Sequence, residues 1–403
     1  MRHIARCSVG GLLALGFSLT GCQQQQEQLQ PWRPPEVGTE YGRPLGPGEL
    51  ALRKIDPADY PDFSPGFYNA ENLAVAIGHS LAYLAKPSSR RYFPYGDITH
   101  ARAVASLEAF RELTGRVASA EELDAAIRRD FDVYQSVGWD HKGAVYFTGY
   151  YCPIFDGRKQ RDAVYRYPLY RLPEDLIKDD EGRILGRRLA DGSVKPRYFT
   201  RGEIEQGHIL DGLEIAWLAD PFQAYVITVQ GSAKLRLEDG SLFEIGYAGN
   251  NGHEYSSVGL RLVSDGVIER DDLSLQTLLR FFAEHPDQID AYCHTNDRYV
   301  FFQETTGGPF GSINVPVIPF RSIATDKEVF PRACLAFVDT VVPTPTDGGV
   351  RQAAFGSFVL DQDTGGAIRA AGRCDIYMGE GPSAEALAGR AGAEGRLYYL
   401  FLK

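Results

Sequence analysis

Two aspartates near the end of the chain have the type and spacing that general acid–base chemistry needs. Asp363 opens the segment Asp363-Thr-Gly-Gly-Ala-Ile368, and Asp375 follows in Arg373-Cys-Asp375-Ile-Tyr377. Glycine lets a backbone approach a ligand closely, and the uncharged residues after Asp375 predict partial burial of its carboxyl group. Burial raises the pKa of a carboxyl group and keeps a proton on it at neutral pH, as a general acid requires.

A structural role is the competing interpretation of these aspartates. Aspartate and glycine are common in turns, where the carboxylate accepts hydrogen bonds from nearby backbone. A further aspartate, Asp339, lies in the apolar segment that begins at Leu335. Spacing alone favours turn-forming aspartates over catalytic ones.

Composition limits the class of protein. The 403 residues include 42 Lys or Arg and 53 Asp or Glu, which gives a formal net charge of −11. Such a length allows two or three domains, and a 24% charged fraction with 12% aromatic residues argues against disorder. Nucleic-acid binding is disfavoured, because phosphates require clustered Lys and Arg. The 43 glycines indicate many turns and short strands in a β-rich globular protein.

The first 22 residues have the pattern of a secretory signal. Two arginines precede an apolar run from Cys7 to Leu19, which is shorter than the roughly 20 residues of a spanning helix. Leu19-Thr-Gly-Cys22 resembles a bacterial lipoprotein signal, in which Cys22 is lipidated and becomes the mature N-terminus; an ordinary signal with an incidental cysteine is the alternative. Gln23 fits delivery to an outer membrane, so we expect a protein lipid-anchored at the periplasmic face of that membrane.

Four further cysteines lack the close spacing of a zinc site. An oxidising periplasm permits disulfides, for which three pairings exist, and buried free thiols explain the cysteines equally well. No cluster of His, Cys and Glu has metal-ligand spacing, so neither a metal nor a cofactor is expected. These cysteines are Cys152, Cys293, Cys334 and Cys374.

Helices are predicted mainly before residue 140 and strands mainly after it. Residues 23–65 are rich in Gln, Pro and Gly, which indicates a tether and an irregular lead-in. Asn69 and Thr99 can each cap a helix, and Ser119-Ala-Glu-Glu122 has the form of a capping box. Regular strand–helix alternation is absent, which disfavours a doubly wound parallel sheet. Strands are predicted at 144–151, 225–230, 234–237, 242–247, 299–303, 335–338, 355–360 and 397–402, with one helix at 274–284.

Several motifs in a fixed order are more specific than any one of them. They are Val145-Tyr-Phe-Thr-Gly-Tyr-Tyr151, Phe199-Thr-Arg-Gly-Glu-Ile204, Leu213-Glu-Ile-Ala-Trp217, Val229-Gln-Gly-Ser232, Gly246-Tyr-Ala-Gly-Asn-Asn-Gly-His253, Val315-Pro316 and Arg321-Ser322. With the tail from Leu335 to Leu402, this series resembles the membrane-bound lytic murein transglycosylase A family, and the tail resembles its three-aspartate domain. The resemblance covers roughly residues 140 to 403. Ala233 and Cys152 depart from the family pattern, which puts a hydroxyl contact at Cys152 in doubt.

The resemblance implies a mainly β, α+β fold of two domains. A double-psi β-barrel catalytic domain with N-terminal helices would comprise residues 66–153 and 299–403. A smaller β-barrel would be inserted at 154–298 to bind substrate, with a glycan cleft between the two domains. Residues 1–22 would be the lipoprotein signal and 23–65 the tether.

The resemblance also implies the activity of a peptidoglycan lytic exotransglycosylase, a carbon–oxygen lyase acting on polysaccharide in cell-wall turnover. Such an enzyme cleaves the β-1,4 bond between N-acetylmuramic acid and N-acetylglucosamine without water and forms 1,6-anhydromuropeptides. Asp375 takes the catalytic position as general acid/base, with Asp363 and Asp339 supporting it. The expected partners are glycan strands and, through Cys22, a membrane. Sugar contacts are expected from Thr148, Tyr150, Gln230, Ser232 and Tyr377.

Two other functions compete with this one. A non-catalytic peptidoglycan-binding lipoprotein with the same fold is the first, although retention of all three aspartates argues against it. A hydrolase that uses Asp375 with a second carboxylate as its base is the other. For the motif residues, core packing in a strand or turn formation is the competing role, because alternation lets only some of Thr148, Tyr150 and Tyr151 face a ligand.

Overall fold

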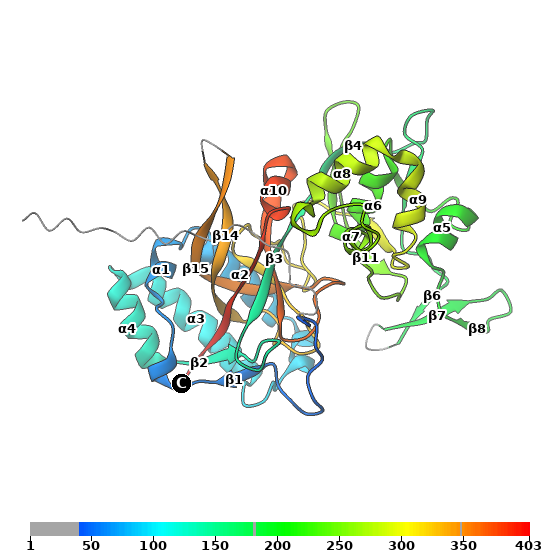
Figure 1. Cartoon of the computed structure of the whole chain (residues 1–403). Helices are drawn as coiled ribbons and strands as arrows, with labels where there is room; N and C mark the ends of the chain where they lie inside the picture. Colours follow the sequence, from blue (N-terminus) through cyan, green and yellow to red (C-terminus); the bar gives the residue numbers. More distant parts are fainter. Residues whose placement is uncertain (1–39, 180–182, 347–348) are drawn as a thin grey trace, which may run out of the picture. The chain divides into compact units, whose positions relative to one another are not determined.

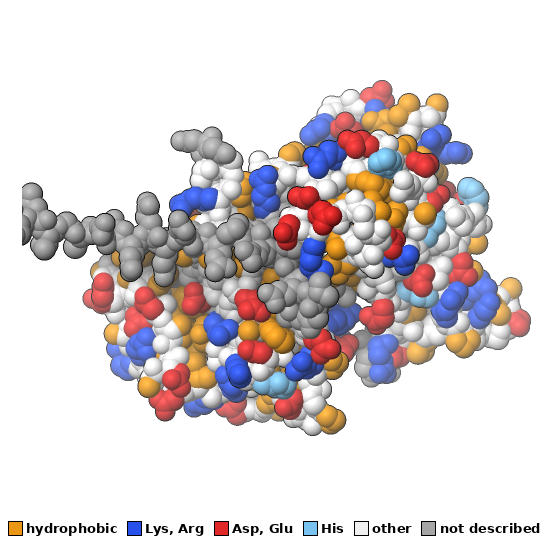
Figure 2. Space-filling model, viewed as in Figure 1, with side chains coloured by type: hydrophobic (Ala, Val, Ile, Leu, Met, Phe, Trp, Pro, Cys, Tyr) orange, Lys and Arg blue, Asp and Glu red, His pale blue; other side chains and the backbone are white. Residues whose placement is uncertain are grey.

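The computed structural model describes residues 40–403 except 180–182 and 347–348. The expected signal segment, Cys22 and part of the expected tether lie outside the described residues. Within the described ranges, none of the helices combines the length and apolar character needed to cross a bilayer. The face in Figure 2 carries acidic and basic side chains interspersed, rather than one continuous basic surface.

Four helices precede the main strands and pack against them (Figure 1). Thr99 and Ser119 cap two of them, accepting hydrogen bonds from the N–H groups of Arg102 and Glu122 as the sequence predicts. The helix expected after Asn69 begins slightly later, behind Asn72. The four are α1 (Ser64–Tyr68), α2 (Leu73–Leu84), α3 (His100–Arg116) and α4 (Ala120–Asp130).

An eight-stranded sheet forms the centre of this part of the chain. Its order is β1-β2-β17-β14-β15-β13-β16-β3, and a further pairing of β17 with β3 closes six of the strands into a barrel. The pairs β13–β15 and β3–β16 are parallel. Helix α10 (Gly381–Ala388) follows β16. The strands are β1 (Leu52–Lys54), β2 (Phe131–Ser136), β3 (Val145–Cys152), β13 (Ser322–Ala324), β14 (Leu335–Thr346), β15 (Gly349–Asp363), β16 (Arg373–Glu380) and β17 (Gly392–Leu402).

The helices and the barrel share one apolar core. The fully buried rings of Phe110 on α3 and Phe358 on β15 lie 4.7 Å apart between centroids. Helix α1 approaches β15 so closely that a Cβ atom at Gly66 would lie 2.3 Å from the Phe358 ring. Such contact distances leave no room for a side chain, which explains the glycine at this position.

Residues between β3 and β13 form a six-stranded sheet, a three-stranded sheet and further helices. The larger sheet has the order β12-β11-β10-β4-β9-β5, and the smaller one β6-β7-β8. The larger comprises β4 (Ile154–Arg158), β5 (Tyr167–Tyr170), β9 (Glu214–Leu218), β10 (Ala233–Arg236), β11 (Leu242–Asn250) and β12 (Val300–Glu304), and the smaller β6 (Leu176–Lys178), β7 (Ile184–Arg188) and β8 (Val194–Pro196). The helices are α5 (Arg201–Gly207), α6 (Pro221–Gln230), α7 (Val258–Ser264), α8 (Leu275–Glu284) and α9 (Ile289–Cys293).

Most predicted strands are confirmed, but the one at 225–230 is wrong. The predicted hairpin is β10–β11, and the predicted helix at 274–284 is α8. Residues 225–230 instead belong to α6. The Asp220 side chain caps the start of this helix by accepting hydrogen bonds from the N–H groups of Phe222 and Gln223, and Gly231, with a φ of 80°, ends it. Residues 224–228 are all buried, so this helix has no polar face that would have revealed a helical period in the sequence.

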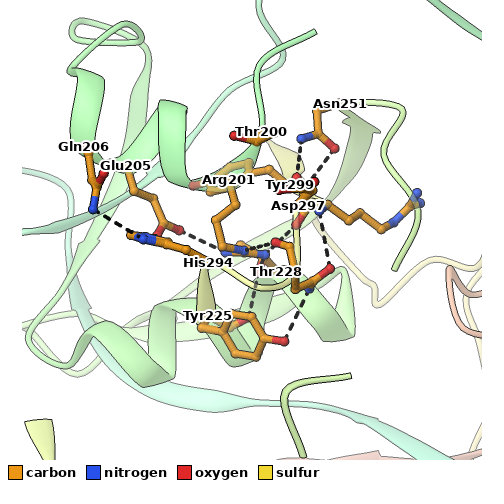
Figure 3. A network of polar contacts seen from close by, with 12 residues as sticks. Thr200, Arg201, Glu205, Gln206, Tyr225, Thr228, Asn251, His294, Asp297 and Tyr299 are labelled. Carbon is orange, nitrogen blue, oxygen red and sulfur yellow. Dashed lines mark hydrogen bonds and ion pairs between the residues drawn. The ribbon is translucent and has the colours of Figure 1, made fainter. Parts of the chain in front are cut away.

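A buried arginine joins the elements around α5 and α6 (Figure 3). Arg201 is 1% exposed, and its Nη2 donates to Thr228 Oγ1 and to the Arg298 carbonyl, both at 2.7 Å. Its Nη1 pairs with Glu205 Oε1 at 2.9 Å, and the other Glu205 oxygen lies 2.9 Å from His294 Nε2. Thus the Phe199–Ile204 motif acts structurally, fixing α6 and the chain that leads into β12.

We predict that His294→Gln lowers stability more in mild acid than in mild base. The hydrogen bond to Glu205 raises the pKa of His294 above its ordinary value. Its ionic contribution, about 1 kcal/mol, is therefore fully present below about pH 6.5 and is lost as pH rises through the raised pKa. Urea unfolding of parent and variant at several pH values measures the difference, and an equal loss at every pH would contradict the prediction.

Candidate active site

The two strands that carry the site, β3 and β16, run parallel and in register. Asp375 pairs with Thr148, and Tyr377 pairs with Tyr150. Side chains at paired positions, and two residues apart along a strand, lie on one face of a sheet. One face of this pair therefore presents Asp375 among hydroxyl and aromatic side chains.

Asp375 is largely buried and makes two polar contacts at one oxygen. The Thr148 hydroxyl donates a hydrogen bond to Oδ1, and Arg373 Nη2 lies 3.6 Å from the same oxygen. The side chain is 17% exposed. Burial raises the pKa of Asp375, and the Arg373 charge and the Thr148 hydrogen bond oppose that rise without cancelling it. The carboxyl group thus holds its proton to a higher pH than an ordinary aspartate does.

Asp363 ends β15 and has both carboxyl oxygens engaged. Tyr150 donates to Oδ2 at 2.9 Å, while the N–H groups of Ser312 and Thr364 each donate to Oδ1 at 2.8 Å. Burial nevertheless raises the pKa of this carboxyl group. Ala324 on β13 is the register partner of both Asp363 and Asp375. The backbones of the two aspartates are thus about 10 Å apart, two strand spacings.

Asp339 lies elsewhere on the sheet, so its predicted proximity to Asp375 and to the glycine loop is wrong. It is exposed in the middle of β14, where its register partners are Gly356 and Arg396. Gly356 is seven residues before Asp363 on β15, about 23 Å along the strand. The long β14–β15 hairpin separates the two positions in a way that sequence distance does not indicate.

A different aspartate, which the sequence analysis missed, supports the loop. Asp326 is 7% exposed, and its Oδ2 accepts a 2.8 Å hydrogen bond from the N–H of Ala370, between Asp363 and Asp375. The neighbouring Thr325 N–H donates to the Asp363 carbonyl at 3.1 Å. The polar run Thr325-Asp326-Lys327, directly after the apolar strand β13, was the available signal.

The negative charge of Asp361, next to the glycine-rich loop after Asp363, is balanced by Lys327. This fully buried carboxylate accepts hydrogen bonds from Thr325 and Lys327 and, at 2.7 Å, from the Tyr399 hydroxyl. Arg321, from the Arg321-Ser322 motif, is 5% exposed and donates hydrogen bonds to the carbonyls of Glu71 and Phe358. Its surroundings are therefore structural.

The expected sugar-contacting residues differ in accessibility. Thr148, Tyr150, Gln230 and Ser232 are all partly exposed. Tyr377 is only 1% exposed, and its ring lies 5.1 Å from that of Tyr150. A direct sugar contact at Tyr377 stays a prediction, while its packing against Tyr150 is observed.

Gln230 and Ser232 lie where α6 meets the barrel strand β3. Gln230 Oε1 accepts a hydrogen bond from the Tyr151 N–H at 3.3 Å, and Ser232 lies beside the thiol of Cys152. His253 bonds the Tyr198 carbonyl at 3.0 Å and so links the segment after β11 to the segment before α5. Gln230 and Ser232 thus lie against the strand that carries Thr148, whereas His253 contacts the segment that leads into α5.

The four cysteines at positions 152, 293, 334 and 374 are all buried free thiols. Burial raises the pKa of Cys152 to about 12, so its thiol is protonated at neutral pH. Across the described ranges, no group of three or more His, Cys, Asp or Glu side chains is arranged to hold a metal ion.

Family models match most of the region that contains the site. The "MltA specific insert domain" matches residues 146–303, and the "3D domain" matches residues 321–401. Over 273 residues the chain is 30% identical to the membrane-bound lytic murein transglycosylase A of Escherichia coli K12, covering 67% of this chain and 69% of that protein. The chain belongs to this family.

Solved structures of lytic murein transglycosylases share the fold. A membrane-bound lytic murein transglycosylase from Agrobacterium tumefaciens matches with a TM-score of 0.72 and 28% identity, covering 88% of this chain and 98% of that one. The E. coli MltA with bound chitohexaose matches with a TM-score of 0.66 and 26% identity, covering 87% and 94%. The expected α+β class, with a double-psi β-barrel and an inserted domain, is confirmed.

We predict that Asp326→Ala lowers the free energy of unfolding by about 1–3 kcal/mol, because it leaves the buried N–H of Ala370 without its acceptor. Asp326→Asn keeps one carbonyl oxygen of the same shape and should lose less. Urea unfolding of the three proteins provides the measurement. An alanine variant as stable as the parent would show that the loop does not depend on this bond.

Proposed function

We propose that this protein is a lytic transglycosylase that cleaves the β-1,4 bond between N-acetylmuramic acid and N-acetylglucosamine in peptidoglycan and releases 1,6-anhydromuropeptides. The observation that carries the mechanism is Asp375, a mostly buried carboxyl group with a raised pKa. Its contacts with Thr148 and Arg373 both fall on Oδ1, which leaves Oδ2 available among the described residues. The E. coli relative with bound chitohexaose supports a glycan strand as the substrate class.

Asp375 serves in both halves of the reaction. In its protonated form it donates to the glycosidic oxygen as the bond to the muramyl C1 breaks. The resulting carboxylate then accepts the proton of the muramyl 6-hydroxyl, whose oxygen bonds to C1 and closes the anhydro ring. Because this attack is intramolecular, its effective molarity is on the order of 10⁵ M or more. No second catalytic carboxylate is required.

The surroundings of Asp363 disfavour the hydrolytic alternative. A hydrolase needs a second carboxylate as nucleophile or as the base that activates water. Both oxygens of Asp363 are already held by Tyr150, Ser312 and Thr364. Asp363 therefore supports the loop and fixes Tyr150, a role consistent with the expectation of a supporting aspartate.

The substrate-binding surface follows from the same elements. Thr148 and Tyr150 border Asp375 on β3, and Gln230 and Ser232 contact that strand from the end of α6. Hydroxyl, amide and aromatic groups suit hydrogen bonding and stacking on sugars. We assign residues 66–153 and 299–403 to the catalytic domain and 154–298 to the substrate-binding insert, with Tyr377 supporting the Tyr150 ring.

Membrane attachment is proposed through the N-terminus. The relatives are named membrane-bound, and the sequence Leu19-Thr-Gly-Cys22 fits lipidation of Cys22. A lipid at Cys22 and a tether over 23–65 would hold the catalytic domain at the periplasmic face of the outer membrane, close to its polymeric substrate.

Asp375→Asn should reduce muropeptide release from purified sacculi by a hundredfold or more, because the amide cannot transfer the proton. Chitohexaose binding should change little, since the side chain keeps its shape. Asp339→Asn is the matched control, with the same substitution in the same domain but away from the site. Mass spectrometry should find anhydro ends in the parent's products, and full turnover by Asp375→Asn would refute the assignment.

Cys22→Ser should move the full-length protein from the outer-membrane fraction to the soluble periplasmic fraction of a Gram-negative host. The reason is that acyl chains contribute about 0.8 kcal/mol of membrane affinity per buried methylene. Asp375→Asn, which keeps Cys22, should remain with the membrane. Unchanged fractionation of Cys22→Ser would count against lipid anchoring.

A further inference from the structure

Arg373 lies on the catalytic face, two residues before Asp375, and contacts the same hydroxyl as that aspartate. Its Nη2 donates to Thr148 Oγ1 at 3.1 Å and lies 3.6 Å from Asp375 Oδ1. Its guanidinium carbon lies 5.7 Å from the centre of the Tyr146 ring. The side chain is 22% exposed, so its charge faces Asp375 from a largely desolvated position.

The Thr148 hydroxyl accepts one hydrogen bond, from Arg373, and donates another, to Asp375. A hydroxyl has one proton to donate, and an arginine has no acceptor atom. Because Arg373 donates to Oγ1, the hydroxyl proton is directed toward its other partner, Asp375 Oδ1. That oxygen must then act as an acceptor, and a proton on the carboxyl group is placed on Oδ2.

We propose that Arg373 is a positioning residue for the general acid: acting through Thr148, it commits Oδ1 of Asp375 to accepting a hydrogen bond and leaves Oδ2 to exchange the proton with the glycan. The inference rests on the proposed function, since it assigns a role within the same proton transfer.

An unmet hydrogen bond argues against a purely structural role for Arg373. Its buried Nε has no hydrogen-bond partner among the described residues. A buried donor without a partner costs about 1–3 kcal/mol. By contrast, Arg201 uses all three of its guanidinium nitrogens in the network of Figure 3. Arg373 thus occupies a costly position where its charge faces the catalytic carboxyl group.

The charge of Arg373 also influences the titration of Asp375. Burial raises the pKa of Asp375, and Arg373 is the largest influence that lowers it. The other titratable groups that interact with Asp375 are neutral at neutral pH, since burial raises the pKa of each: Tyr146, Tyr150, Tyr255 and Cys374. Arg373 is therefore the cation that limits how far the pKa of Asp375 rises.

The test is the pH dependence of muropeptide release from purified sacculi. Arg373→Met keeps the length of the side chain and removes its charge and its hydrogen bond to Thr148. The basic limb of the profile should move to higher pH by about one to three units, because Asp375 then keeps its proton longer. Activity at the optimum should fall severalfold as the proton loses its fixed position, and Arg373→Lys should keep the basic limb nearer to that of the parent.

A double variant separates positioning from general structural damage. Thr148→Val should also move the basic limb upward, and combining it with Arg373→Met should give less than the sum of the two shifts, because the two residues act through one hydrogen-bond chain. Arg396→Met, on β17 beside Asp339, is the control for losing an arginine from the barrel. Its profile should match that of the parent.

Two outcomes would overturn the inference. One is an Arg373→Met profile that superimposes on the parent's profile, and the other is a uniform loss of activity with no shift along the pH axis. Failure of the proposed function would look different. In that case Asp375→Asn would remain active, whatever the behaviour of Arg373→Met.

Discussion

The parallel pairing of β3 with β16 is the constraint on which the site depends. It joins Thr148 to Asp375 across 227 positions of sequence. A parallel pair needs a long connection, and here the connection holds the insert and the barrel strands β13, β14 and β15. The same pairing fixes the register of Tyr150 with Tyr377, so a slip of one residue would turn the Asp375 carboxyl group to the opposite face.

Around this pair, the polar groups are arranged so that one acid remains available. Asp361 is neutralised by Lys327 and bonded by Tyr399, and Asp326 is held by backbone N–H groups. Asp363 has three donors on its two oxygens. Asp375 differs because its contacts gather on Oδ1. Desolvation and the Arg373 charge act on it in opposite directions, and their balance suits a group that must release a proton and take it back.

The ordered motifs predicted the family, the fold class and the position of Asp375, because short motifs are local in sequence. The sequence-based prediction failed where the role or the secondary structure of a residue depends on neighbours that are distant in sequence. Asp339 resembled a supporting aspartate, yet the hairpin β14–β15 carries it away, and Asp326 takes the supporting place through Ala370. The apolar run at 225–230 resembled a strand, yet α6 is buried on nearly every side, so no helical period was visible.

By itself, the sequence determined which residues could do chemistry and where strands, helix caps and turns are favoured. These properties depend on side-chain type and on neighbours a few positions away. The tertiary structure alone decided which aspartate is free and which are held, because hydrogen-bond donors reach them from other strands. It also decided that Thr148 contacts Asp375 and that Arg373 lies beside both of them. Strand register sets those contacts, and register emerges only when the barrel closes.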